Sequence, residues 1–187
     1  ELPAPPEDPT NAWADDPDAA DLGRAFFFDP LFSGELIDSD NDGSEHALGV
    51  AGETGKVSCA GCHVPEAGFL DDRSLGQQIS LAAGWVLRRT PSLLDVGQAK
   101  LLGWGGRRDG FHNQAFQPLE SRDEMNTSRL YVAQEVFARH REAYEAIFGA
   151  LPPLDDEQRF PALAAGVTGC RQSIGDDPPE CHGMPGD

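Results

Sequence analysis

The pentapeptide Cys59-Ala60-Gly61-Cys62-His63 constrains this chain more than any other feature of its sequence. Two cysteines separated by two residues, with a histidine directly after the second, form the attachment signature of a c-type haem. The two thiols add across neighbouring vinyl groups of the porphyrin, and the next residue brings an imidazole nitrogen to the iron. The motif therefore predicts one covalently bound haem c, with thioethers at Cys59 and Cys62 and with His63 as the proximal iron ligand.

Three other kinds of site use the same cysteine spacing: a redox-active dithiol, one half of a zinc site and a disulfide. A zinc site needs a second pair of ligands at a suitable spacing, and Cys170 and Cys181 match this poorly. A thioredoxin-like dithiol needs a βαβ context that the chain lacks. Haem is the favoured interpretation, and because haem c is attached outside the cytoplasm, we expect a periplasmic or otherwise exported protein.

The composition narrows the choice of partners. The 187 residues include 32 acidic and 14 basic side chains, which gives a formal net charge of -18. Nucleic acids and anionic lipid surfaces are bound through basic patches, so we expect neither as a partner, and a cationic partner is favoured. No apolar run approaches the roughly 18 residues that a membrane span needs, so no membrane span is expected.

The hydrophobic periodicity predicts helices joined by loops. Helical patterns cover residues 18–28, about 112–120, 130–140 and 141–148. Asp18 can cap the first helix, Thr127 or Ser128 can cap the third, and Gly149 is a stop signal for the last. Neither a hairpin signal nor an alternating strand pattern is present. The sequence thus predicts a mainly α fold, a cytochrome c-like haem domain with long irregular loops.

Several separated blocks of the sequence, taken in order, are similar to one known family. They are LGRAFFFDPLFSG, KVSCAGCHVPEAGFLDD, RRTPSLLDV, GWGGRRD, NQAFQPLESRDEM and YEAIFGALPPL. Over residues 22–161 the chain resembles the N-terminal, peroxidatic-haem domain of the bacterial dihaem cytochrome c peroxidases, which include the MauG-like enzymes. The resemblance implies that the haem at His63 reacts with hydrogen peroxide.

The resemblance also implies roles on the distal side of that haem. Glu124, just before a methionine, matches the catalytic glutamate, which acts as a general base and then as a general acid. Gln114 matches the distal glutamine that orients peroxide, Pro118 matches the distal proline, and Trp104 matches the tryptophan between the two haems. Taken alone, Glu124 is better explained as a solvated carboxylate or a charge at a helix N-terminus; Gln114 is compatible with a surface helix residue and Trp104 with a core residue. His112 and Met125 are alternative iron ligands.

The chain also departs from the family pattern. Gly105 stands where the family has an acidic residue, and Arg89 replaces the asparagine that ligates a calcium ion between the two domains. The second haem domain is absent from the sequence. The expected electron source is therefore a second haem domain, a donor cytochrome or a cupredoxin. The alternative function is that of a non-catalytic electron-transfer cytochrome, either alone or as a subunit of a multi-haem assembly.

Two further segments carry metal or disulfide predictions. The acidic insert at residues 33–56 contains Asp38-x-Asp40-x-Asp42-Gly, the first half of an EF-hand-type calcium loop, although a solvated acidic loop explains it as well. Near the C-terminus, Cys170 and Cys181 favour a disulfide over a stretched second haem motif. We expect an acidic, proline-rich segment at 1–17, the haem domain at 18–161 and a linker-like tail at 162–187.

Overall fold

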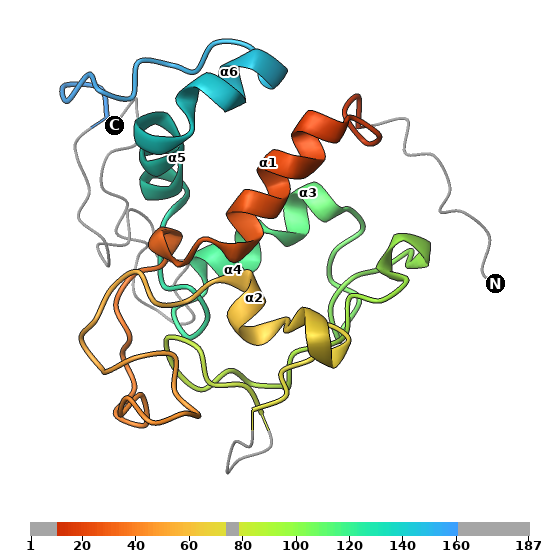
Figure 1. Ribbon diagram of the computed structural model, residues 1–187, viewed down its shortest axis with the longest axis vertical. Helices are drawn as coiled ribbons and strands as arrows, with labels where there is room; N and C mark the ends of the chain where they lie inside the picture. Colours follow the sequence, from red (N-terminus) through yellow and green to blue (C-terminus); the bar gives the residue numbers. More distant parts are fainter. Residues whose placement is uncertain (1–10, 74–78, 161–187) are drawn as a thin grey trace.

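The computed structural model describes residues 11–73 and 79–160 of the chain. Within these residues, helices alternate with irregular loops, and β-structure is limited to isolated bridges. This confirms the predicted mainly α fold. Figure 1 shows α1, α5 and α6 in the upper half of the view and the long loops below them. None of the described helices is long and apolar enough to span a bilayer. Cys170, Cys181 and the 162–187 tail lie outside the described residues.

The first helix, α1 (Pro17–Phe28), begins earlier than predicted. Asp16, not Asp18, is the N-cap, and its Oδ1 accepts a hydrogen bond from the Ala19 amide at 2.9 Å. Proline suits the first helical position because the amide it lacks has no helical partner there. The helix ends at Asp29, and the Pro30–Phe32 turn, η1, follows directly. α1 packs against α2 (Cys59–Cys62) and α6 (Arg141–Phe148), so it connects the cysteine motif to the helical end of the molecule.

The helix expected near 112–120 is divided in two. The structure has α3 (Phe111–Gln114) and α4 (Phe116–Glu120), with Ala115 between them. Pro118 explains the division, since it has no amide hydrogen to donate to the carbonyl four residues earlier, which is that of Gln114. The two short helices therefore lack one helical hydrogen bond where they meet.

The last two helices follow the predicted boundaries closely. Ser128 caps α5 (Arg129–Arg139), with its Oγ accepting from the Tyr131 amide at 3.1 Å. α6 ends at Gly149, whose φ of 86° lies in a region that glycine adopts readily. The remaining turns are η2 (Pro65–Ala67) and η3 (Val96–Gln98).

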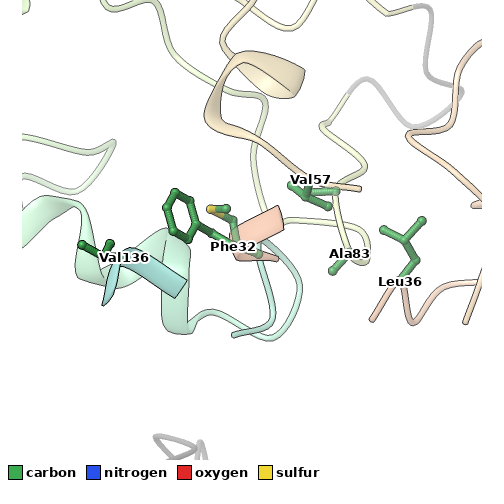
Figure 2. Close-up of a cluster of buried hydrophobic side chains, with 7 residues drawn as sticks. Phe32, Leu36, Val57, Ala83 and Val136 are labelled. Carbon is green, nitrogen blue, oxygen red and sulfur yellow. The ribbon is translucent and has the colours of Figure 1, made fainter. Parts of the chain in front are cut away.

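The hydrophobic core joins segments that are far apart in the sequence. Figure 2 shows Phe32, Leu36, Val57, Ala83 and Val136 together, and Ala82 and Met125 complete the cluster. Cys59 and Cys62 pack against its edge. The core thus supports the cysteine motif directly.

The acidic insert at 33–56 is a folded part of this core. Its two ends are joined by Ser33, whose Oγ accepts from the amides of Lys56 and Val57 at 3.0 and 2.9 Å. Inside the insert, the buried Asn41 side chain donates to the carbonyls of Ala82 and Ala83. The insert is therefore hydrogen-bonded to residues 82–83, and the Ala83 amide also donates to the Glu124 carbonyl.

Candidate haem site

The cysteine motif forms one capped turn of helix. Ser58 is the N-cap of α2, with its Oγ 3.1 Å from the Gly61 amide, and the His63 amide donates to the Cys59 carbonyl at 2.8 Å. Side chains three residues apart lie on one face of a helix, so Cys59 and Cys62 point in a common direction. Both cysteines are free thiols and half-buried. This arrangement fits two thioether bonds to one porphyrin edge.

The protonation of the thiols distinguishes between the kinds of site. Burial raises the pKa of Cys62 to about 12, although the nearby Arg73 opposes the shift, and burial also raises the pKa of Cys59. Redox-active dithiols and zinc sites use thiolates, whose pKa is lowered by their surroundings. The raised pKa values therefore argue against a redox-active dithiol, which needs a thiolate at neutral pH.

His63 is oriented by a backbone carbonyl. Its Nδ1 lies 3.2 Å from the Phe69 carbonyl oxygen, and because a carbonyl only accepts, Nδ1 carries the hydrogen and the Nε2 lone pair is left for a metal. Ligating histidines in metal sites commonly donate their second ring nitrogen in this way. Burial lowers the pKa of His63, which favours the neutral imidazole that a metal requires.

A strained turn supplies that carbonyl. Phe69 has a φ of 60°, a region in which a bulky side chain costs about 1–2 kcal/mol. Gly68 before it has a φ of 69°, and a Cβ there would lie 3.4 Å from Leu94 Cδ1. The Phe27 ring from α1 packs against both Phe69 and His63, with ring centroids 6.2 and 6.4 Å apart. The turn is thus held by packing from a separate helix.

A buried ion pair borders the cysteine motif. Arg73 donates to both carboxylate oxygens of Asp71, at 2.9 and 2.7 Å, and also to the Leu81 carbonyl at 2.7 Å. The same guanidinium lies 3.5 Å from Cys62 Sγ. Arg89 donates to the Asp71 carbonyl. Through these contacts the ion pair fixes the loop at residues 81–89 to the cysteine motif. It also places a positive charge beside the sulfur of Cys62.

Gln114 and Pro118 lie where α3 meets α4. Both are half-buried, and Gln114 Oε1 is buried without a hydrogen-bond partner among the described residues. A buried oxygen normally accepts a hydrogen bond, so a donor from a bound molecule is expected beside Gln114 Oε1. His112, two residues before Gln114, is exposed. The pKa of Asp109 is lowered by a hydrogen bond from Asn113 and, to a smaller extent, by the nearby His112. Met125 is buried in the core cluster.

Glu124 has a half-buried side chain with polar neighbours. Burial raises the pKa of its carboxyl group, while hydrogen bonds from Ser121 and Gln117 and the charge of Arg107 oppose the rise. Glu124 in turn acts electrostatically on Cys62, so the acid and the attachment cysteine lie in one neighbourhood. Its carbonyl accepts from the Ala83 amide at 2.9 Å. The arrangement suits a group that gains and loses a proton.

Trp104 is largely exposed, with 64% of its surface accessible. Its indole Nε1 donates to the Arg89 carbonyl at 2.9 Å, which fixes the ring edge and leaves the ring face open. Other large apolar side chains on the same segments are also exposed: Leu70, Leu94, Leu101, Phe111 and Phe116. A porphyrin fits this site on two counts: the paired thiols of one helical turn and the half-buried His63 imidazole, whose pKa is lowered by burial.

The acidic insert shows no assembled cation site. Asp38 and Asp42 each accept from a backbone amide two residues ahead, at 2.9 Å, and Asp40 accepts from Trp85 Nε1 at 2.8 Å. In the part of the chain that the structure describes, no three His, Cys, Asp or Glu side chains converge as metal ligands. Calcium binding by this loop stays a prediction, which titration calorimetry of the wild-type and Asp40→Ala proteins would test.

Sequence reasoning missed several groups around the site. Phe69 contributes only its carbonyl, and Arg73 reaches Cys62 from eleven residues away. Ser121 and Gln117 hydrogen-bond to Glu124. One signal was present for these two: on a helix, Gln117 and Ser121 follow Gln114 at spacings of three and seven residues, which is one face. No comparable signal pointed to Phe69 or Arg73.

Comparison with known proteins agrees with this site. The family model described as di-haem cytochrome c peroxidase matches residues 17–168. The chain is 30% identical, over 79% of its length, to the methylamine utilization protein MauG of Methylorubrum extorquens, and covers 36% of that protein. It is 29% identical to the MauG of Methylophilus methylotrophus, over 67% of the chain and 30% of the relative.

A third relative has a different name. The cytochrome-c peroxidase IdrP2 of a Pseudomonas species is 30% identical over 53% of the chain and 21% of the relative. The chain thus spans about a third or less of the length of the curated relatives that it matches.

Proposed function

The chain belongs to the di-haem cytochrome c peroxidase family, and on this premise we propose that it is a haem c domain that reduces hydrogen peroxide. The observation that carries the proposal is the position of Glu124, a half-buried carboxyl group whose neighbours include Ser121, Gln117 and the attachment residue Cys62. The family match over residues 17–168 supports a haem domain at 18–161. When bound, haem supplies the redox-active iron.

Glu124 moves the protons of the reaction. As a general base, it takes a proton from one oxygen of hydrogen peroxide, and as a general acid it returns that proton to the oxygen that leaves as water. Burial favours the protonated form of Glu124, while Ser121, Gln117 and Arg107 favour the ionised form. Opposing influences of this kind keep both forms accessible, as a group with two successive roles requires.

Gln114 and Pro118 shape the space in which peroxide binds. The buried Oε1 of Gln114 has no partner among the described residues and can accept a hydrogen bond from peroxide or water. The Pro118 ring has no hydrogen-bonding group, so it limits the volume of the site without competing for the substrate. Trp104, with an exposed ring face, is the proposed relay for electrons.

The electrons come from outside the described domain. We propose a second haem domain, a donor cytochrome or a cupredoxin as their source. The net charge of -18 favours a donor with a cationic docking face, because opposite charges speed the encounter of two proteins. Since haem c is attached outside the cytoplasm, the proposed location is the periplasm or another exported compartment.

The test is the Glu124→Gln variant, which removes the titratable proton and keeps the shape. Peroxide turnover should fall by about 10²–10⁴-fold, the contribution of a positioned acid–base group, with the haem spectrum retained. Glu66→Gln, at an exposed carboxylate on η2, is the matched control and should turn over peroxide normally. Unchanged turnover in Glu124→Gln would refute the role of Glu124.

The axial ligands of the haem iron in the wild-type protein distinguish two further candidate functions. Two of the relatives carry the name MauG, which favours a MauG-like oxidation as the second candidate. The exposed Trp104 favours a third, a non-catalytic electron carrier. Two strong protein ligands on the iron in both oxidation states would indicate the carrier, whereas one free axial position facing Glu124 would indicate an enzyme.

A further inference from the structure

A cavity of about 300 Å³ lies beside α4. Its lining comes from the 107–108 segment, from α3 and α4, from Ser121 and from the start of α5: Arg107, Arg108, Asn113, Phe116, Gln117, Glu120, Ser121 and Arg129. The volume is at the lower end of the range for small-molecule sites. A cavity of this size suits a small ligand.

The lining is cationic in a strongly acidic protein. Three guanidinium groups and one carboxylate line the cavity, although the whole chain carries a net charge of -18. The carboxylate is already paired, since Arg129 donates to both oxygens of Glu120 at 2.6 and 2.7 Å. Arg129 also lies over the Phe116 ring, 4.9 Å from its centroid. This wall is electrically neutral and fixed.

The opposite wall keeps its positive charge. Among the residues that the structure describes, Arg107 and Arg108 form no salt bridge; the contact of Arg108 that is within hydrogen-bond distance is with the Arg107 carbonyl, at 3.3 Å. Asn113 adds an amide that donates to Asp109 and whose buried Oδ1 has no partner among those residues. Both guanidinium groups line the same cavity, so an anion bound there would be attracted by both.

The cavity shares residues with the proposed distal acid. Gln117 and Ser121 line the cavity and also hydrogen-bond to Glu124, and Arg107 is the cation that acts on Glu124. A ligand bound here is therefore one side chain away from the carboxyl group that handles the protons.

We propose that this cavity binds a small oxyanion, either a carboxylate or an inorganic oxyanion, between Arg107 and Arg108. Guanidinium groups bind both kinds of anion through paired, charge-assisted hydrogen bonds. A bound anion offsets the charge of Arg107 and so favours the protonated form of Glu124. This consequence rests on the proposed function, whereas the binding itself does not.

The binding test uses the haem-loaded protein and titration calorimetry with sodium acetate and with sodium phosphate at constant ionic strength. Saturable binding of either probe supports the proposal, and the probe that binds more tightly identifies the kind of anion. Arg108→Gln should weaken binding by about tenfold or more, because it removes hydrogen bonds from a charged donor. Arg122→Gln removes the same charge from an exposed arginine outside the cavity and should bind normally.

Several outcomes would overturn the proposal. They are an absence of saturable binding, as expected if the carboxylates of haem itself fill the cavity; an equal loss of binding in Arg108→Gln and Arg122→Gln; and binding that shifts the Soret band, which would place the anion on the iron. The Glu124→Gln protein separates the two proposals. It should still bind the anion, so a failure of the peroxidase proposal leaves this one testable.

Discussion

The attachment turn at residues 58–70 and the distal segment at 104–127 are built in opposite ways. The hydrogen bonds within the attachment turn are local, and the longest of them, between His63 and Phe69, spans six residues, while Phe27 and Arg73 contact the turn from outside it. The distal segment depends on distant partners, and Asn126 Nδ2 donates to the Glu35 carbonyl across 91 residues. The hydrogen bonds of the attachment turn can therefore form in a short stretch of chain, whereas the surroundings of Glu124 depend on contacts between distant segments.

The largest effect is expected at the attachment turn. Replacing both Cys59 and Cys62 with alanine removes every thioether, so haem extracted with acidic solvent should leave no pyridine haemochrome in the protein. In the Cys170→Ala/Cys181→Ala protein, haem content should stay at one per chain. A fall to half of the wild-type haem in that control would mean that the C-terminal pair holds a second haem.

The second test breaks a distant contact of the distal segment. Asn126→Ala removes the bond to Glu35 at a buried position with a φ of 48°, and should destabilise folding by about 1–3 kcal/mol. For a chain of this size, that lowers Tm by about 2–4 °C per kcal/mol. Peroxide turnover should fall as well, because Glu124 is two residues away, while haem content stays constant. A loss of haem from the Asn126→Ala protein, with normal turnover per remaining haem, would contradict this expectation.

The third test concerns pH. Burial raises the pKa of Glu124, so turnover, which needs the ionised base, should decline with falling pH at a higher pH than for an ordinary glutamate. Ser121→Ala removes a hydrogen bond that favours the ionised form, and should move this acid limb to still higher pH. The pH profile of kcat/KM measures both. An acid limb that moves to lower pH would show that Ser121 does not act on Glu124.

The smallest effect is expected from the cap of the attachment turn. Ser58→Ala should cost about 1 kcal/mol, the usual value of an N-cap. Thermal unfolding of the haem-loaded protein measures this cost. Because the cap is local, turnover at saturating peroxide should be unchanged, and a loss of more than a few-fold would show that the two regions are coupled.

The same contrast explains what the sequence could predict. The mainly α fold, the cap at Ser128 and the stop at Gly149 were predicted from local patterns and are present. The single helix at 112–120 was wrong, because the effect of Pro118 on the preceding turn was not considered. The groups around Glu124 were not predicted as a set, since the turn that brings Ser121 and Gln117 back to Glu124, in which the Glu124 and Asn126 amides donate to the Ser121 carbonyl, has no pattern signal. The roles of Glu124, Gln114 and Trp104 stay predictions.

The use of a backbone oxygen to hold His63 has a consequence for how this domain tolerates change. A main-chain acceptor cannot be deleted by substitution, so the electron-donating character of the imidazole is insulated from mutations at position 69. Phe69→Gly would relieve the unfavourable φ and still present the same oxygen, at the expense of the packing with Phe27. The donor strength of the proposed His63 ligand thus depends on the path of the chain between residues 63 and 69 rather than on a side-chain acceptor.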